Sequence, residues 1–277
     1  MKGNLKKQIA YDLKMGIWGR RRIVLLYIVI VVGLCASITA EAHSRRLNSP
    51  MLMDYLAKIF SGMQEYSHMD RTESFKIPGE WVVIQMLYLL FVGIYPKADF
   101  SERGYQNMIR SKRKVNWWIS KCVWIVASTW LYYAVLYVVL LIFSFVQNGM
   151  NIGANQDIWR IGISRLSNKQ LFLALFMLPM LVSCTYGMMQ LVLSFIWSPI
   201  IGVLALTLLN VASAYWCNVF LIGNYTMLYR NKEIMVNNGV DSETGVFLCS
   251  AIILFCVLAG SKYFSKLDIT LNKFLIK

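Results

Sequence analysis

The residues best suited to chemistry by type lie between Glu41 and Asp70, where two histidines accompany several carboxylates. Imidazole and carboxylate groups are common zinc ligands. The residues concerned are His43, His68, Glu41, Asp54, Glu65 and Asp70. Their spacing matches no metal-binding motif, so we expect ordinary polar residues of a folded segment and no metal centre.

The sequence lacks the common motifs of enzyme chemistry. It contains no GxSxG, no HExxH and no GxxxxGK[ST] phosphate loop, so it predicts neither hydrolysis nor nucleotide binding by this chain. Six cysteines lie in or beside apolar stretches without a CxxC pair, and we expect them to be small buried hydrophobic residues. We therefore predict no catalytic site and no cofactor within the chain.

Long apolar runs are the elements that must position any functional residue. Hydrophobic residues make up 57% of the 277 positions and charged residues 15%, whereas a soluble domain has about 25% charged residues. A helix needs about 20 apolar residues to cross a bilayer, and the absence of in/out alternation argues against a barrel. We predict an all-α, polytopic membrane protein with six transmembrane helices, at residues 23–40, 79–96, 117–146, 170–197, 199–222 and 245–261.

The distribution of charge predicts the orientation of these spans. The N-terminal segment, the loop 97–121 and the C-terminal tail hold 18 of the 28 basic residues and four of the 14 acids. The segments 41–78, 147–169 and 223–244 would lie outside. Because basic residues concentrate in cytoplasmic loops, both termini should be cytoplasmic. The net charge of +14 then reflects orientation and contact with anionic lipid, and requires no nucleic acid.

The first 22 residues have the pattern of an amphipathic surface helix. Leu5, Ile9, Leu13 and Ile17 are spaced four apart and form one apolar stripe. Such a helix would lie on the inner membrane surface before the first span. The alternative is a solvated basic tail that only enforces topology.

Polar residues within the predicted spans are few. We find no ionisable side chain in the span interiors, which argues against a proton-coupled or sodium-coupled carrier. Gln190 and Asn210 remain. Such residues usually form hydrogen bonds between helices, and lining a transport pathway is the alternative role for both.

The predicted cytoplasmic loop 97–121 has internal order. Ser101 could cap a short helix that begins with Glu102 and ends near the basic residues Arg110, Lys112, Arg113 and Lys114. We expect Trp117 and Trp118 at the headgroup level, with Lys121 snorkelling to the interface. A short charged helix suits the docking of a soluble subunit; the alternative is a loop that only maintains topology.

With this segment, SERGYQNMIRSKRKVNWWISK, and its six-span plan, the chain resembles the membrane subunits of bacterial ABC type-two exporters. The resemblance implies a coupling helix that docks in a soluble ATPase, with that role on Ser101, Glu102, Arg103, Gly104, Tyr105 and Asn107. It also implies two ATP-binding cassette subunits, which bind ATP and Mg²⁺, and a second membrane subunit, identical or homologous.

The protein would then be a permease in the bacterial plasma membrane that exports an amphipathic or hydrophobic cargo, such as a peptide, antibiotic or lipid. A non-transporting immunity, sensor or scaffold subunit is the alternative function. The family's short outer helices between spans five and six would correspond to Tyr225–Val236.

Local signals predict helix boundaries in the outer segments and at one turn. Ser49 and Pro50 indicate the start of a short helix with an apolar face from Leu52 to Met63. The S-x-x-Q pattern at Ser167–Gln170 predicts a capping box. Ser198 and Pro199 predict the turn between spans four and five.

Overall fold

The computed structural model describes residues 3–64, 77–101, 114–149, 158–235 and 238–266, and the regular structure in these ranges is helical. The longer helices are α1 (Gly3–Leu13), α2 (Arg21–Ser44), α4 (Gly79–Gly93), α7 (Val115–Asn148), α9 (Leu178–Ile196), α10 (Pro199–Tyr215) and α11 (Ser242–Lys266). Shorter ones are α3 (Leu52–Ile59), α5 (Tyr95–Asp99) and α8 (Asn168–Phe172). A π-helical turn, η4 (Leu173–Met177), joins α8 to α9. The all-helical prediction is confirmed for these ranges.

Five helical stretches within the described residues are long and apolar enough to cross a membrane: Arg21–Ser44, Gly79–Asp99, Val115–Gln147, Asn168–Ile196 and Ser242–Lys266. A further apolar helix, α10, lies between the last two of these stretches and has 17 residues, which at 1.5 Å per residue span about 26 Å. The hydrocarbon core of a bilayer is about 30 Å thick. By length and composition, the chain therefore has the architecture of a membrane protein with five apolar helices able to span the bilayer.

The predicted end of the fifth span at residue 222 is wrong, because α10 ends at Tyr215. The backbone of Trp216 is extended, and the side-chain Nδ2 of Asn224 donates to the carbonyl oxygens of Trp216 and Asn218, both at 3.0 Å. These bonds satisfy carbonyls that a longer helix would have used. The region predicted as outer helices instead contains two short 3-10 turns, Ile222–Thr226 and Leu228–Arg230.

One predicted helix cap and one predicted turn are confirmed, and a second predicted cap is wrong. Ser167 and Gln170 exchange both bonds of a capping box, and the hydroxyl of Ser198 accepts the N–H of Ile201 at 3.2 Å. The short outer helix α3 begins at Leu52, two residues later than the predicted start at Pro50. Its first turn is closed by Asp54, whose Oδ2 accepts the N–H of Met51 at 2.9 Å.

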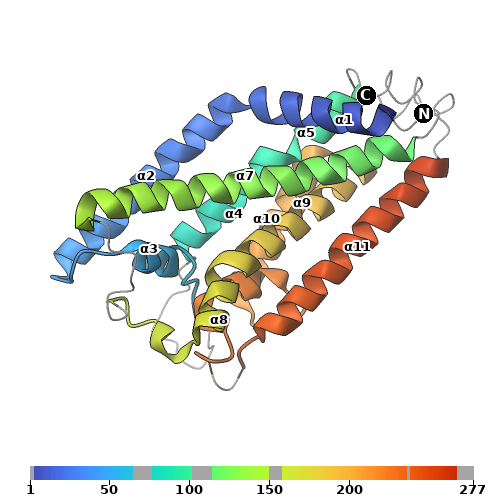
Figure 1. Ribbon diagram of the computed structural model, residues 1–277. Helices are drawn as coiled ribbons and strands as arrows, with labels where there is room; N and C mark the ends of the chain where they lie inside the picture. Colours follow the sequence, from blue (N-terminus) through green and yellow to red (C-terminus); the bar gives the residue numbers. More distant parts are fainter. Residues whose placement is uncertain (1–2, 65–76, 102–113, 150–157, 236–237, 267–277) are drawn as a thin grey trace.

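The helices surround α9, which contacts α4, α7, α10 and α11 (Figure 1). On its other side, the long helix α7 packs against α1 and α2. Helices α1 and α5 and the last turns of α11 lie at one end of the bundle, and α3 and α8 lie at the other. We call the first end the α1 end.

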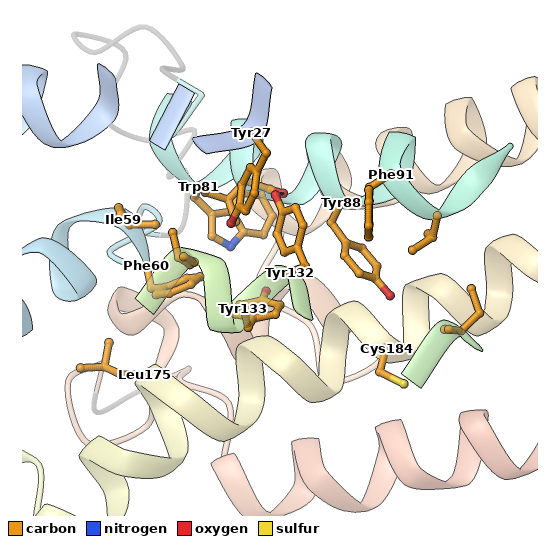
Figure 2. Packing of buried hydrophobic residues seen from close by; sticks show 14 of the residues in the cluster. Tyr27, Ile59, Phe60, Trp81, Tyr88, Phe91, Tyr132, Tyr133, Leu175 and Cys184 are labelled. Atoms are coloured by element: carbon orange, nitrogen blue, oxygen red, sulfur yellow. Dashed lines mark hydrogen bonds between the residues drawn. The ribbon is translucent and has the colours of Figure 1, made fainter. Parts of the chain in front are cut away.

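Buried tyrosines join the helices in the middle of the bundle (Figure 2). Tyr27 of α2 stacks on Tyr132 of α7 with ring centroids 4.0 Å apart. The hydroxyl of Tyr132 donates to the carbonyl of Ile84 at 2.7 Å, and that of Tyr88 pairs with Thr129 at 2.7 Å. The rings of Tyr88 and Tyr132 bury apolar area while their hydroxyls bond a neighbouring helix, which is how polar groups are accommodated inside a membrane bundle.

Candidate functional site

A buried ionic cluster lies at the α1 end and joins three helices. The ammonium group of Lys121, on α7, lies 2.7 Å from Oδ1 of Asp12 on α1 and 2.6 Å from Oδ2 of Asp99 on α5. Lys121 is completely buried, and the two aspartates are at most 8% exposed. We call these three residues the Lys121 cluster.

Neighbouring polar groups complete the bonding of the Lys121 cluster. The hydroxyl of Tyr95 donates to Oδ1 of Asp12 at 3.0 Å, and the hydroxyl of Ser120 donates to its Oδ2. The Lys121 ammonium also lies 4.5 Å from the centre of the Tyr95 ring. The buried ammonium and carboxylate groups therefore have charge-assisted hydrogen bonds and a cation–π contact within the protein.

Arg20 supplies a second positive charge beside the Lys121 cluster. Its guanidinium lies 5.7 Å from the centre of the Tyr95 ring and donates to the carbonyl of Phe91. Burial lowers the pKa of Arg20 to about 10, so it remains cationic at neutral pH. Together with Asp12, Asp99 and Lys121 it gives two positive and two negative charges.

Three sequence predictions about this region are wrong. Lys121 does not snorkel to the interface, because it is completely buried. Trp117 and Trp118 are each 1% exposed and pack against Phe264, so they are core residues of the bundle. The predicted third span therefore does contain a buried ionisable residue, Lys121, whose partners come from distant segments.

One sequence signal could have revealed the Lys121 cluster. Asp12 is the only acid among the first 22 residues. It lies seven positions after Leu5 and three after Ile9, so it shares the apolar stripe of the predicted surface helix. A carboxylate on an apolar face requires a buried partner. In the structure this face of α1 packs on α7, which makes α1 a docked helix of the bundle.

The predicted coupling residues follow directly after this cluster. Ser101 is exposed, and its hydroxyl donates to the carbonyl of Lys97 at 3.1 Å. Glu102, Arg103, Gly104, Tyr105 and Asn107 lie outside the described residues. Two residues of the Lys121 cluster therefore flank the segment 102–113. Asp99 lies on α5, which precedes this segment, and Lys121 lies on α7, which follows it.

The two candidate pathway residues are buried between helices. Gln190 of α9 is 1% exposed, and its Nε2 donates to the carbonyl of Pro199 at 2.9 Å. A Cβ on Gly202 would lie 2.8 Å from its Oε1, so this side chain fills the contact between α9 and α10. Asn210, also 1% exposed, donates to the carbonyl of Leu206 at 3.2 Å. The contacts of Gln190 join α9 to α10, whereas the hydrogen bond of Asn210 stays within α10, and a pathway role for either residue stays a prediction.

The acidic residues considered as metal ligands have other contacts. Glu41 pairs with Arg45 at 2.7 Å and with Lys58 at 2.9 Å, and Asp54 closes the first turn of α3. His43 is exposed, whereas His68, Glu65 and Asp70 lie outside the described residues. Five of the six cysteines are buried as expected; Cys217 is partly exposed and donates to the carbonyl of Asn238 at 3.1 Å.

A second feature is an apolar groove between α7, the η4–α9 segment and α11. Its volume is about 680 Å³, and its lining includes Trp130, Ala134, Phe176, Met180 and Ile253. Figure 1 shows α7 and α11 side by side at the α1 end and separated toward the other end. The groove lies where these helices separate.

No protein-family model, curated protein or solved structure matches the chain. Functional conclusions therefore depend on the Lys121 cluster and on the groove.

Proposed function

We propose that the chain is the permease subunit of an ATP-driven ABC exporter in the bacterial plasma membrane. It would pair with a second membrane subunit, identical or homologous, and with two soluble ATPase subunits that bind ATP and Mg²⁺. Its cargo would be amphipathic or hydrophobic. The observation that carries this proposal is the contact of Asp99 and Lys121, which links the helices on both sides of the predicted docking loop.

The Lys121 cluster supports coupling because it makes the base of this loop rigid. A flexible loop would absorb the movement of a docked ATPase, whereas a base held by buried ion pairs would transmit it. The bonds of Lys121 to Asp99 and Asp12 connect α5, α7 and α1 at one point. Since α7 has 34 residues, a tilt at this point would be carried along about 50 Å of helix.

The arrangement of the bundle supports a cytoplasmic location for the α1 end. The N-terminal helix, the helices around the loop 102–113 and the end of α11 gather there (Figure 1). These are the segments in which the sequence concentrates basic residues. In this orientation α10 is the fifth and shortest of six spans, and both termini are cytoplasmic.

Co-purification tests the docking role directly. Tagged protein extracted from its native membrane should retain a soluble ATPase, identified by mass spectrometry. The double change Glu102→Lys, Arg103→Glu should remove it, because it reverses the charges of the predicted docking helix. Lys169→Glu, at an exposed position of the opposite end, is the matched control and should retain it.

A second measurement separates transport from an immunity, sensor or scaffold role. In proteoliposomes the complex should hydrolyse ATP, and hydrolysis should depend on an intact Lys121 cluster. Asp99→Asn should leave the ATPase bound while uncoupling hydrolysis from the membrane subunit. ATPase binding without any movement of hydrophobic reporter compounds would favour the non-transporting alternative.

A further inference from the structure

The apolar groove begins within about two helical turns of the Lys121 cluster along α7. Along α7, its lining residues Thr129 and Tyr137 follow Lys121 by eight and 16 positions. A rise of 1.5 Å per residue places them about 12 and 24 Å from the buried ion pairs. The hydrocarbon core is about 30 Å thick, so with the α1 end at the cytoplasmic headgroups, as proposed above, the groove would lie at the depth of the lipid chains.

The end of the groove nearest to the α1 end is closed by aromatic packing. Trp118 stacks on Phe264 with ring centroids 5.1 Å apart, and its indole N–H donates to the carbonyl of Val257 at 3.2 Å. A Cβ on Gly260 would overlap the Trp118 ring, so α7 and α11 are in close contact there.

Two hydroxyl groups that line the groove already have partners. The hydroxyl of Thr129 donates to the carbonyl of Ile125 at 2.9 Å and pairs with Tyr88 at 2.7 Å. The hydroxyl of Tyr137 lies within 3.4 Å of the carbonyls of Leu175 and Phe176. The remaining polar groups are the thiol of Cys184, a weak donor, and the indole N–H of Trp130. An extended peptide would leave most of its backbone N–H and C=O groups without partners here, so a peptide is a poor occupant of this groove.

We propose that this groove binds one hydrocarbon chain of an amphiphilic molecule. Its volume of about 680 Å³ falls within the range of ligand pockets, and its aromatic and methionine side chains suit a flexible apolar chain. The π-helical turn Leu173–Met177 lies beside Phe172 and carries Phe176 and Met177 into the lining. The further assignment of this hydrocarbon chain to the cargo rests on the proposed export function. It narrows the cargo of the protein to acyl amphiphiles.

Photolabelling tests the groove without any variant. The purified chain in nanodiscs is exposed to a fatty acid with a diazirine in its chain, and labelled residues are mapped by mass spectrometry. Labels should concentrate on groove residues such as Phe176, Met177 and Met180. Equal labelling of Leu254 and Phe255, which are exposed on α11 outside the groove lining, would overturn the proposal.

A matched pair of substitutions on α7 sharpens this test. Ala134→Trp fills the groove and should reduce labelling about tenfold, which corresponds to 1.4 kcal/mol of binding. Leu141→Trp is the control, because Leu141 is seven positions further along the same face and is 49% exposed. Equal labelling of both variants contradicts the proposal. So does labelling of the groove by a diazirine-bearing hydrophobic peptide and not by the fatty acid. Conversion from a dimer to a monomer by Ala134→Trp alone would instead assign the groove to a second copy.

The result of the groove-labelling experiment can be distinguished from the result of the ATPase-docking experiment that tests the proposed function. Labelling of the groove needs no ATPase, whereas the docking experiment needs no acyl chain. Groove labelling in a protein that retains no ATPase would reject the exporter and leave the acyl-chain site standing.

Discussion

Oδ2 of Asp99 lies 2.6 Å from the ammonium nitrogen of Lys121, although 22 positions separate the two residues in the sequence. The segment between them includes the predicted docking helix. Because both side chains are buried, water cannot replace either partner when the pair is broken. This contact makes the base of the loop one of the parts of the protein most sensitive to substitution.

Lys121→Met tests the energetic weight of the cluster. The substitution preserves side-chain length but leaves two buried carboxylates without their cation, and breaking a buried ion pair costs about 3 to 5 kcal/mol. We expect a large decrease in the midpoint of thermal unfolding, measured in detergent. Lys169→Met is the control, since Lys169 and Glu243 are about 80% exposed and 3.8 Å apart. Equal midpoints for the two variants would show that the cluster contributes no stability.

Removal of the carboxylates should partly rescue the loss of Lys121. Asp12→Asn and Asp99→Asn each leave Lys121 with one anionic partner, so each single change should cost less than Lys121→Met. The triple variant, which combines both changes with Lys121→Met, removes every charge of the Lys121 cluster and should be about 1 to 3 kcal/mol more stable than Lys121→Met alone. Unfolding free energies that simply add across the four variants would contradict direct coupling.

Gly260→Ala should separate α7 from α11 at the closed end of the groove. The new Cβ would overlap the ring of Trp118, which is 1% exposed and cannot move freely. Overpacking of this kind costs about 1 to 3 kcal/mol. Gly33→Ala is the control in α2, because a Cβ added there would meet no atom within 4 Å, and alanine favours the helix by about 1 kcal/mol. The two variants should change the unfolding midpoint in opposite directions.

Arg230→Lys should destabilise the end of the bundle opposite α1. The Arg230 guanidinium donates to the carbonyls of Met63, Gln64 and Ala214 at 2.8 to 3.3 Å. A lysine ammonium keeps the charge but cannot reproduce this planar set of donors. Hydrogen bonds to charged groups contribute about 1.5 to 3 kcal/mol each, so thermal unfolding should shift to lower temperature. Arg45→Lys, at an exposed ion pair with Glu41, should unfold like the parent protein.

The helical elements were predictable because their signals are local. Apolar runs such as 170–197 identify spanning helices, and Ser167, Gln170 and Ser198 act on N–H groups within three residues. The errors arose where a distant residue decides the structure. Asn224 satisfies the carbonyl of Trp216 beyond the end of α10, and Phe264 covers Trp117 and Trp118, which had been expected at the membrane surface.

The sequence by itself determined that this is a helical membrane protein with a strongly basic set of end segments, because length, apolarity and charge are sums over neighbouring residues. Only the tertiary structure decided that Asp12, Asp99 and Lys121 meet in one buried cluster. No short-range pattern encodes a contact between residues 109 positions apart. The groove likewise exists only because α7 and α11 meet at one end of the bundle and separate toward the other.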